Sequence, residues 1–335
     1  MAMTKNNLTM STQSQFPVAS QSATVTELLE ASKRPNTLLA YKSDWLLFGK
    51  WCAETDLQAL PASAETVAEY IASKVSELRP ASLQRHCASI AQAHRVSNFK
   101  SPTESELVRT VLQGVRAQAG LTRQVKREGR KVKAPALSSE DMRKVIAGLP
   151  NDGAGLRDLA LLLVGYKAAL RRNELAALQW WQVESKPEGI LLNLANSKTD
   201  STYSGQQVAL VREGGTYCPV EALDEWRKWC INSAGMSATD LEAGAVFRSI
   251  NKHSHIGTSL TSHSVGEIVK ARTAGVGLEG VTAHSLRRGH ITEGHLQGKQ
   301  EADLMKTSRH RSVAVFRTYI DEADPFARAT GKGLL

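Results

Sequence analysis

The sequence predicts a mainly α-helical protein of two domains, the second of which contains a small β-sheet. The chain has 335 residues, enough for two domains with hydrophobic cores of their own. Segments with helical periodicity or Ala-rich helical composition occupy most of the chain after residue 36. Runs typical of β-strands are confined to residues 190–194 and 207–211.

The first domain is predicted to be all-helical and to span residues 23–120. Residues 1–22 are rich in Ser, Thr, Gln and Asn and are expected to form a flexible N-terminal tail. Asn36 can cap the first helix, whose stripe of apolar and aromatic residues consists of Leu38, Tyr41, Trp45, Phe48 and Trp51. Further helices are expected at 63–76, 80–95 and 103–118. We interpret the aromatic stripe as core packing rather than as a surface on which bases stack.

Residues 121–134 are predicted to be a basic linker between the domains. Its sequence LTRQVKREGRKVK (121–133) has six basic residues against one Glu and shows no apolar periodicity. Such a run is usually a solvated linker, but between two domains of a basic protein it could also lie along a phosphate backbone. The cations that would then make these contacts are Arg123, Lys126, Arg127, Arg130, Lys131 and Lys133.

The second domain is predicted to span residues 135–335 and to be mostly helical. It begins with a capping box at Ser138 and Asp141. A strongly apolar helix at 156–166 and a short one at 171–178 precede the two β-type runs, which would pair as a small sheet or hairpin with Lys198 near its turn. Later helices are expected at 220–233, 261–273, 284–297, 299–306 and 312–321.

Composition narrows the class of protein. A net charge of +9 and a pI of about 9.4 favour a polyanionic partner. The four cysteines are scattered without a CxxC pair, which favours reduced thiols over a disulfide framework or a zinc site. No apolar run approaches the length of a membrane span, and the N-terminus lacks the apolar core of a signal peptide, so we expect an intracellular protein.

One set of residues carries the chemistry. Arg171 is followed three residues later by Glu174, and His284 and Arg287 form an H-x-x-R pair that lies on one face of a helix. His310 and Tyr319 come further along the chain. Two guanidiniums can each hold non-bridging phosphate oxygens in a bidentate fashion. The set therefore favours attack of a phenolic oxygen on a phosphodiester.

Each of these residues also has an ordinary structural explanation. A Tyr between Thr and Ile that closely follows Phe316 is usually a core aromatic, and an H-x-x-R on a helix is usually a surface pair or a cap. Arg171 with Glu174 would ordinarily be an i, i+3 ion pair, and Lys198 a solvated turn residue. The joint order Arg, Lys, His-x-x-Arg, His, Tyr within a two-domain chain is what favours the catalytic interpretation.

These positions resemble the tyrosine recombinase (phage integrase) family over nearly the whole chain. Asn36 to Cys52 look like the start of its core-binding domain, and Cys218-Pro219-Val220 and Val246-Phe247-Arg248 look like landmarks of its catalytic domain. By this resemblance Arg171 matches the family's first arginine, Lys198 the lysine of its β-hairpin, and His284 and Arg287 its H-x-x-R pair. His310 matches the next motif position and Tyr319 the nucleophile.

The resemblance implies a site-specific DNA recombinase whose two domains clamp duplex DNA. His284 would act as the base or proton shuttle, His310 would donate a hydrogen bond to a phosphate oxygen, and Lys198 would protonate the leaving 5′-oxygen. Glu174 would orient an arginine or histidine, and neither a metal nor another cofactor is implied. The product would be a 3′-phosphotyrosyl bond, followed by strand exchange through a Holliday junction.

The implied partners are double-stranded DNA with two inverted half-sites, a homodimer on each site and a homotetramer in the synapse, with no membrane. The implied location is the cytoplasm, on the nucleoid of a prokaryote or on phage or plasmid DNA. The segment after Tyr319 would either pack on a neighbouring protomer or fray.

The chain departs from the family pattern at two positions. Arg309 precedes His310 where the family usually has Gly, and Ala169 stands where Gly is often found before the first motif arginine. Two other functions are open alternatives: a non-catalytic DNA-binding accessory or regulatory protein of the same fold, and a nicking-closing enzyme like a type IB topoisomerase or telomere resolvase.

Overall fold

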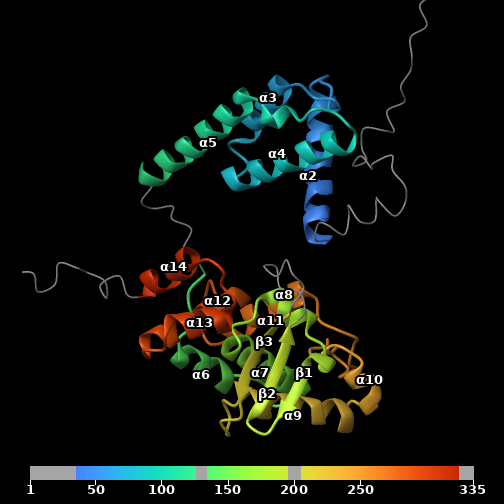
Figure 1. The fold of residues 1–335 in the computed structure, drawn as a ribbon. Coiled ribbons are helices and arrows are strands. Elements are labelled where there is room, and N and C mark those ends of the chain that lie inside the picture. Colours follow the sequence, from blue (N-terminus) through green and yellow to red (C-terminus); the bar gives the residue numbers. More distant parts are fainter. Residues whose placement is uncertain (1–34, 126–133, 195–204, 324–335) are drawn as a thin grey trace, which may run out of the picture. The chain divides into compact units, whose positions relative to one another are not determined.

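The computed structural model describes residues 35–125, 134–194 and 205–323, which belong to two compact units, residues 1–131 and 132–335 (Figure 1). The first unit contains only helices in its described part, and the second is mostly helical with one three-stranded sheet. The predicted fold class, mainly α with a minor sheet, is confirmed. No helix in these described ranges combines the length and apolar composition that a membrane span needs.

The first unit has its helices where periodicity predicts them. They are α2 (Pro35–Glu54), α3 (Ala64–Lys74), α4 (Pro80–Val96), the 3-10 helix η1 (Pro102–Glu104) and α5 (Glu106–Val125). Two boundaries differ from the prediction. Asn36 lies inside α2 rather than at its cap, with Pro35 in the first turn, where its fixed φ and missing N–H are tolerated. Helix α5 continues to Val125, so the first five residues of the predicted linker are helical.

The aromatic stripe of α2 forms part of the core of the first unit, as predicted. Trp45 and Phe48 are buried beside Tyr70 of α3. Asp44 on the same helix is also buried, because Arg85 of α4 donates two hydrogen bonds to its carboxylate at 2.7 and 2.9 Å. Charge-assisted hydrogen bonds of this kind let a carboxylate join α2 to α4 inside the core.

The second unit supplies the candidate site. Its helices are α6 (Ser139–Ala147), α7 (Gly153–Lys167), α8 (Arg172–Ala177), η3 (Trp180–Gln182), α9 (Pro219–Asn232), α10 (Ala238–Glu242), α11 (Ser262–Ala274), α12 (Ala283–Leu296), α13 (Glu301–Ser308) and α14 (Val313–Ala323). The predicted capping box at the start of α6 is present: Ser138 Oγ accepts from the Asp141 N–H at 3.0 Å, and Asp141 accepts from the Ser138 N–H at 3.1 Å.

The sheet contains strands β1 (Val183–Lys186), β2 (Gly189–Leu194) and β3 (Gln206–Val211), all antiparallel and in that order. The register pairs Val183 with Leu192 and Gly189 with Val211. Sequence reasoning found β2 and β3 but missed β1, whose sequence VESK is polar and mostly exposed. Helix α10 was missed as well, since its five residues are too few to show a period.

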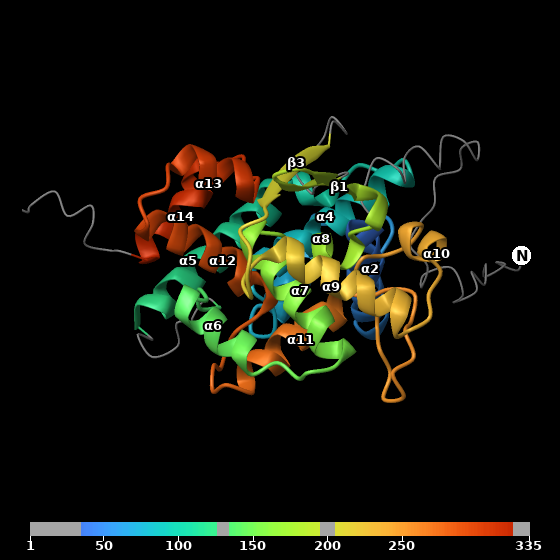
Figure 2. The ribbon, with the colours of Figure 1, turned by 90° about the horizontal axis from the view of Figure 1, so that it is seen from below.

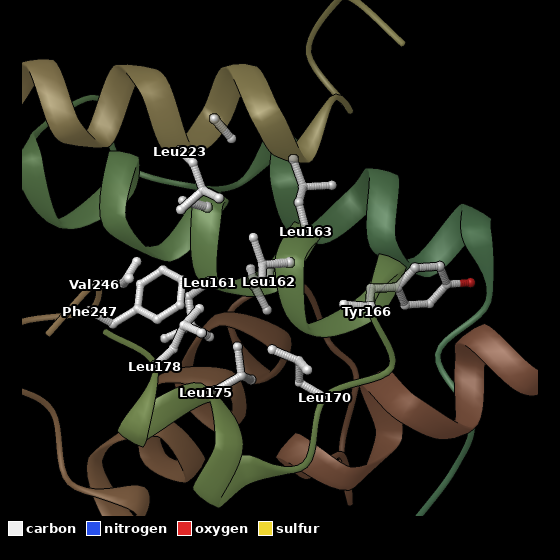
Figure 3. Packing of buried hydrophobic residues seen from close by; sticks show 14 of the residues in the cluster. Leu161, Leu162, Leu163, Tyr166, Leu170, Leu175, Leu178, Leu223, Val246 and Phe247 are labelled. Carbon is white, nitrogen blue, oxygen red and sulfur yellow. The ribbon is translucent and has the colours of Figure 1, made fainter. Parts of the chain in front are cut away.

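Helix α7 is the centre of the second unit's core. Its residues Leu161 to Val164 are all buried, so it is covered on several sides rather than on one stripe (Figure 3). Helix α9 packs along it (Figure 2), and α8 and α12 contact it as well. The close approach of α12 depends on Gly289, because a Cβ at this position would overlap the Leu137 carbonyl oxygen and the Tyr166 ring.

Replacing His290 by Phe should remove part of the pH dependence of stability. Burial, followed by the positive charges of Arg287 and Lys167, lowers the pKa of His290 from 6.5 to about 4. Between these values the unfolded chain binds a proton that the folded chain does not, so the free energy of unfolding falls as the pH falls, for this residue by about 2 kcal/mol. Urea unfolding of wild type and His290→Phe at about pH 7.5 and about pH 4.5 measures the difference. Equal losses in the two proteins would show that His290 titrates normally in the folded state.

Candidate active site

Arg171 and Glu174 are positioned by the turn between α7 and α8. Ala169 adopts a left-handed conformation with φ 48°, and Arg171 then caps α8. The carboxylate of Glu174 accepts from the backbone N–H of Arg171 and from its Nη1, both at 2.7 Å. Burial alone would raise the pKa of Glu174, but the guanidiniums of Arg309 and Arg171 outweigh it and lower the pKa. Glu174 is therefore a carboxylate that holds Arg171 in place.

His284 and Arg287 lie near the start of α12, as the H-x-x-R spacing predicts. The side chain of Arg287 is almost fully buried, with 1% exposure. Its Nη1 donates to the Ala169 carbonyl oxygen at 2.7 Å, and its Nη2 lies 3.3 Å from both ring nitrogens of His310. Burial, followed by the positive charges of Arg171 and Arg309, lowers the pKa of Arg287 to about 9, so the group is still charged at neutral pH.

His310 follows α13 and is held by its neighbours. Its backbone N–H donates to the Met305 carbonyl oxygen at 3.1 Å, and its Nδ1 lies 2.8 Å from Ser308 Oγ. Burial, followed by the positive charge of Arg287, lowers the pKa of His310 to about 3. The imidazole is therefore neutral at physiological pH.

Tyr319 projects from α14 toward His284. The phenolic oxygen lies 3.1 Å from His284 Nε2, and the Arg288 guanidinium lies over the phenol ring at 5.5 Å from its centre. On the same helix Phe316 and Ile320 are buried in a small core, whereas Tyr319 is half-buried at its edge. The aromatic neighbour of Tyr319 thus has the ordinary core role, and Tyr319 does not.

The position and the lowered pKa of His284 suit it to accept a proton from Tyr319. The residue is exposed, yet partial desolvation of its ring, followed by the positive charges of Arg287, Arg288 and Arg171, lowers its pKa. At neutral pH the ring is uncharged and lies beside the phenol. A base that is neutral and within hydrogen-bond distance of the group it deprotonates meets the geometric condition for general base catalysis.

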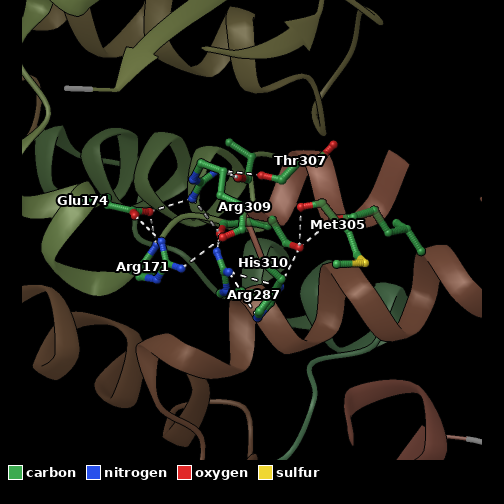
Figure 4. Close-up of polar contacts among 11 residues, drawn as sticks. Arg171, Glu174, Arg287, Met305, Thr307, Arg309 and His310 are labelled. Carbon is green, nitrogen blue, oxygen red and sulfur yellow. Dashed lines mark hydrogen bonds and ion pairs between the residues drawn. The ribbon is translucent and has the colours of Figure 1, made fainter. Parts of the chain in front are cut away.

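The structure brings together the predicted residues that it describes in full. Figure 4 shows Arg171, Glu174, Arg287 and His310. The Tyr319 ring lies beside the rings of His310 and His284. Lys198 lies outside the described residues. So do the linker cations Lys126, Arg127, Arg130, Lys131 and Lys133; Arg123 is part of α5, but its side chain is not described. No role of the linker is therefore read from the structure.

Sequence reasoning missed two arginines, Arg288 and Arg309. Arg288 directly follows the H-x-x-R pair, and its contact with Tyr319 depends on how α12 and α14 pack. Arg309 was noted only as a departure before His310, yet its side chain has 1% exposure and reaches Glu174. The available signal was an arginine just after a predicted helix end, next to a candidate site residue.

Comparison with known proteins settles the family. The model of the phage integrase family matches residues 135–325, which is more than half of the chain. The chain belongs to the phage integrase family of tyrosine recombinases. It is 29% identical over 307 residues to an integrase/recombinase xerD homolog of Selenomonas ruminantium, a match that covers 89% of this chain and 85% of that protein.

Solved structures of other integrases have the same fold. The Tn1549 transposon integrase in complex with transposon right-end DNA has a TM-score of 0.57 at 13% identity, covering 88% of this chain and 92% of that one. A lambda integrase tetramer bound to a Holliday junction has a TM-score of 0.56 at 15% identity, covering 89% of this chain and 75% of that one. At such identities these likenesses show the fold, and the site rests on this chain's own residues.

Ala168 and Ala169 offer a matched test of the turn that precedes Arg171. Both are fully buried, but φ is −91° at Ala168 and 48° at Ala169. We expect Ala168→Gly to lower the free energy of unfolding by about 1–2 kcal/mol through lost methyl burial and added backbone entropy. Ala169→Gly also loses a buried methyl group but removes a left-handed strain of similar size, so its free energy of unfolding should stay within about 0.5 kcal/mol of wild type. Urea unfolding of both variants is the measurement, and equal losses would contradict a strained turn.

Proposed function

We propose that this protein is a site-specific DNA recombinase that cuts and rejoins duplex DNA through a covalent bond between Tyr319 and a 3′-phosphate. The observation that carries the proposal is the placement of the Tyr319 oxygen 3.1 Å from His284, next to a cluster that contains Arg171 and Arg287. Membership of the phage integrase family supports the same reaction.

The two arginines would bind the scissile phosphate. A phosphodiester carries one negative charge and gains more in its pentacoordinate transition state, so a preorganised positive site favours the transition state over the substrate. Arg171 is oriented by Glu174, and Arg287 by the Ala169 carbonyl oxygen. Because both guanidiniums are positioned before DNA arrives, little reorganisation is needed when the reaction occurs.

Cleavage would proceed by one displacement at phosphorus. The Tyr319 oxygen forms a bond to phosphorus while the bond from phosphorus to the 5′-oxygen breaks. His284 accepts the phenolic proton, and Lys198 donates a proton to the leaving 5′-oxygen. The phosphotyrosyl bond conserves the energy of the broken linkage, so attack by a 5′-hydroxyl rejoins the strand without ATP, and no divalent metal takes part.

His310 would donate a hydrogen bond to a phosphate oxygen from the ring nitrogen that does not contact Ser308. Its Nδ1 is engaged by the Ser308 hydroxyl, so a hydrogen bond to a phosphate oxygen would come from Nε2. A bound phosphate raises the pKa of a neighbouring imidazole, which favours the doubly protonated ring that can make this bond.

Strand exchange would require two DNA duplexes. We infer inverted half-sites with one protomer on each, four protomers in the synapse, and a Holliday junction between two rounds of cleavage. The tetrameric lambda integrase on a Holliday junction supports this assembly by likeness of fold. The two-domain clamp, DNA contacts by the basic linker and a cytoplasmic location on DNA belong to the same proposal.

Tyr319→Phe should abolish covalent attachment and leave DNA binding unchanged, because it removes only the attacking oxygen. The assay incubates protein with labelled fragments of its own genomic neighbourhood in EDTA without nucleotide, and separates covalent complexes in denaturing gels. Wild type should form a complex that protease removes. A covalent complex formed by the Phe variant would exclude Tyr319 as the nucleophile, and a strict Mg²⁺ requirement would exclude the mechanism.

Arg171→Ala should lower the single-turnover cleavage rate about 10²–10³-fold at saturating DNA, the loss typical of removing one transition-state donor. Arg287→Lys keeps the charge but loses the planar fork and should lose a comparable factor. Quench-flow cleavage and equilibrium binding are measured on the same DNA. An effect confined to affinity would favour a non-catalytic DNA-binding protein, and relaxation of supercoiled DNA without exchange between duplexes would favour a nicking-closing enzyme.

A further inference from the structure

Arg309 adopts a backbone conformation that arginine rarely takes. It ends α13 with φ 57° and ψ 45°, the left-handed region in which glycine is the usual residue. Its side chain is nevertheless almost fully enclosed, with 1% exposure. An arginine in this position therefore has two unfavourable features, a strained backbone and a buried charge, which its contacts must offset.

The contacts of the Arg309 guanidinium lead to the turn that carries Arg171 (Figure 4). Its Nη2 donates to Glu174 Oε2 at 2.6 Å and to the Ala169 carbonyl oxygen at 3.2 Å. Its Nη1 donates to the carbonyl oxygens of Ala168 at 3.1 Å and Thr307 at 2.6 Å. All of these acceptors except Thr307 lie in the segment from the end of α7 to α8.

Both candidate catalytic arginines are linked to Arg309. Glu174 uses its other oxygen, Oε1, to accept from Arg171 Nη1, and Arg171 Nη2 in turn lies 3.4 Å from the Arg309 carbonyl oxygen, to which it donates. The Ala169 carbonyl oxygen accepts from Arg287 as well as from Arg309. One buried side chain thus fixes the acceptors that orient both guanidiniums.

Arg309 also changes the charge of the site. Arg171 and Glu174 alone form a neutral pair, whereas with Arg309 the three groups carry one net positive charge. A carboxylate that is not balanced in this way would oppose the approach of a phosphate to Arg171. Arg309 satisfies Glu174 from the buried side and leaves Arg171 positive toward the exposed side, where its side chain has 26% exposure.

We propose that Arg309 is a positioning residue for strand cleavage, which holds Glu174 and the Ala169 carbonyl and balances the carboxylate so that Arg171 and Arg287 act on the scissile phosphate. The proposal rests on the proposed function. Arg309 itself is enclosed and does not touch DNA; it acts through Glu174, Arg171 and Arg287.

A double-mutant cycle on the full-length protein separates this role from a purely structural one. Arg309→Met should lower the single-turnover cleavage rate about 10–100-fold at saturating DNA, with the dissociation constant for DNA changed less than about threefold. Glu174→Gln added to Arg309→Met should restore at least about tenfold of this loss, because the unbalanced charge is gone and the amide oxygen still accepts from Arg171. If the loss of cleavage rate in the double variant equals the product of the losses in the two single variants, the proposal is overturned.

Arg248→Met is the matched control for losing a buried arginine. Arg248 lies in the same unit, has 7% exposure and donates to the carbonyl oxygens of Ala245, Gly257 and Asp240. It should lower the thermal midpoint while the cleavage rate, measured below that midpoint, stays within about twofold of wild type. A cleavage loss in Arg248→Met equal to that in Arg309→Met would mean that only stability is at work.

Arg309→Gly guards against a variant that does not fold, because glycine relieves the left-handed backbone. Guanidinium ion at low millimolar concentration should accelerate cleavage by Arg309→Gly at least about threefold and leave Arg248→Gly unchanged. Equal responses of the two variants would overturn the positioning role.

A further measurement needs no DNA. In spectra of side-chain-labelled protein, the Nε–H signal of Arg171 should shift in Arg309→Met and return toward wild type when Glu174→Gln is added. An unmoved signal would overturn the positioning role even if no covalent complex forms. Absence of any Tyr319-dependent complex in wild type would instead count against the proposed function.

Discussion

The arrangement of the site depends on keeping the Arg287 guanidinium charged while it is almost entirely out of water. A buried charge is costly unless polar groups surround it. The Ala169 carbonyl oxygen accepts from it at 2.7 Å, and the left-handed turn at Ala169 directs this oxygen toward α12. An anion that reaches such a group is attracted far more strongly than in bulk water, because the surroundings are less polar. The buried Arg287 guanidinium is therefore able to attract an anion such as a phosphate more strongly than an arginine in solvent would.

The candidate site combines side chains from three distant parts of the chain. Arg171 comes from the turn after α7, His284 and Arg287 from the start of α12, and Tyr319 from α14. Close packing fixes how these parts meet. The missing side chain of Gly289 lets α12 approach Tyr166 and Leu137, and the burial of Phe316 and Ile320 against Ile291 and Leu304 fixes α14 on α12. Small shifts in this packing would move the phenol of Tyr319 relative to the guanidiniums. The geometry of the site therefore depends on the packing of the core.

Periodicity and residue order were sufficient for what depends on local sequence. The helix that contains Trp45 and Phe48, the capping box at Ser138 and the pairing of β2 with β3 follow from spacing and residue type. Strand β1 did not, because its polar residues form a strand only by pairing with β2. The candidate site residues were predicted from their joint order. The left-handed turn at Ala169 was not foreseen, because nothing about an alanine signals a positive φ. The buried partner of Glu174 was missed for a related reason, since contact between Arg309 and α8 is a property of tertiary packing alone.

His284 and His310 have different hydrogen-bond partners, which give their ring nitrogens different properties. Ser308 donates its hydroxyl proton to the Leu304 carbonyl oxygen at 2.6 Å, so toward His310 it can only accept, and the proton of the neutral His310 ring lies on Nδ1. Nε2 is then an acceptor that faces the Arg287 guanidinium. The His284 ring has a different partner: its Nε2 faces a phenol that can give up a proton. The His310 ring can therefore donate from Nε2 to a phosphate oxygen only after it gains a second proton, which the negative charge of a phosphate favours. A neutral histidine next to a phenol is suited to removing a proton. These partners support the proposal that His284 rather than His310 is the base.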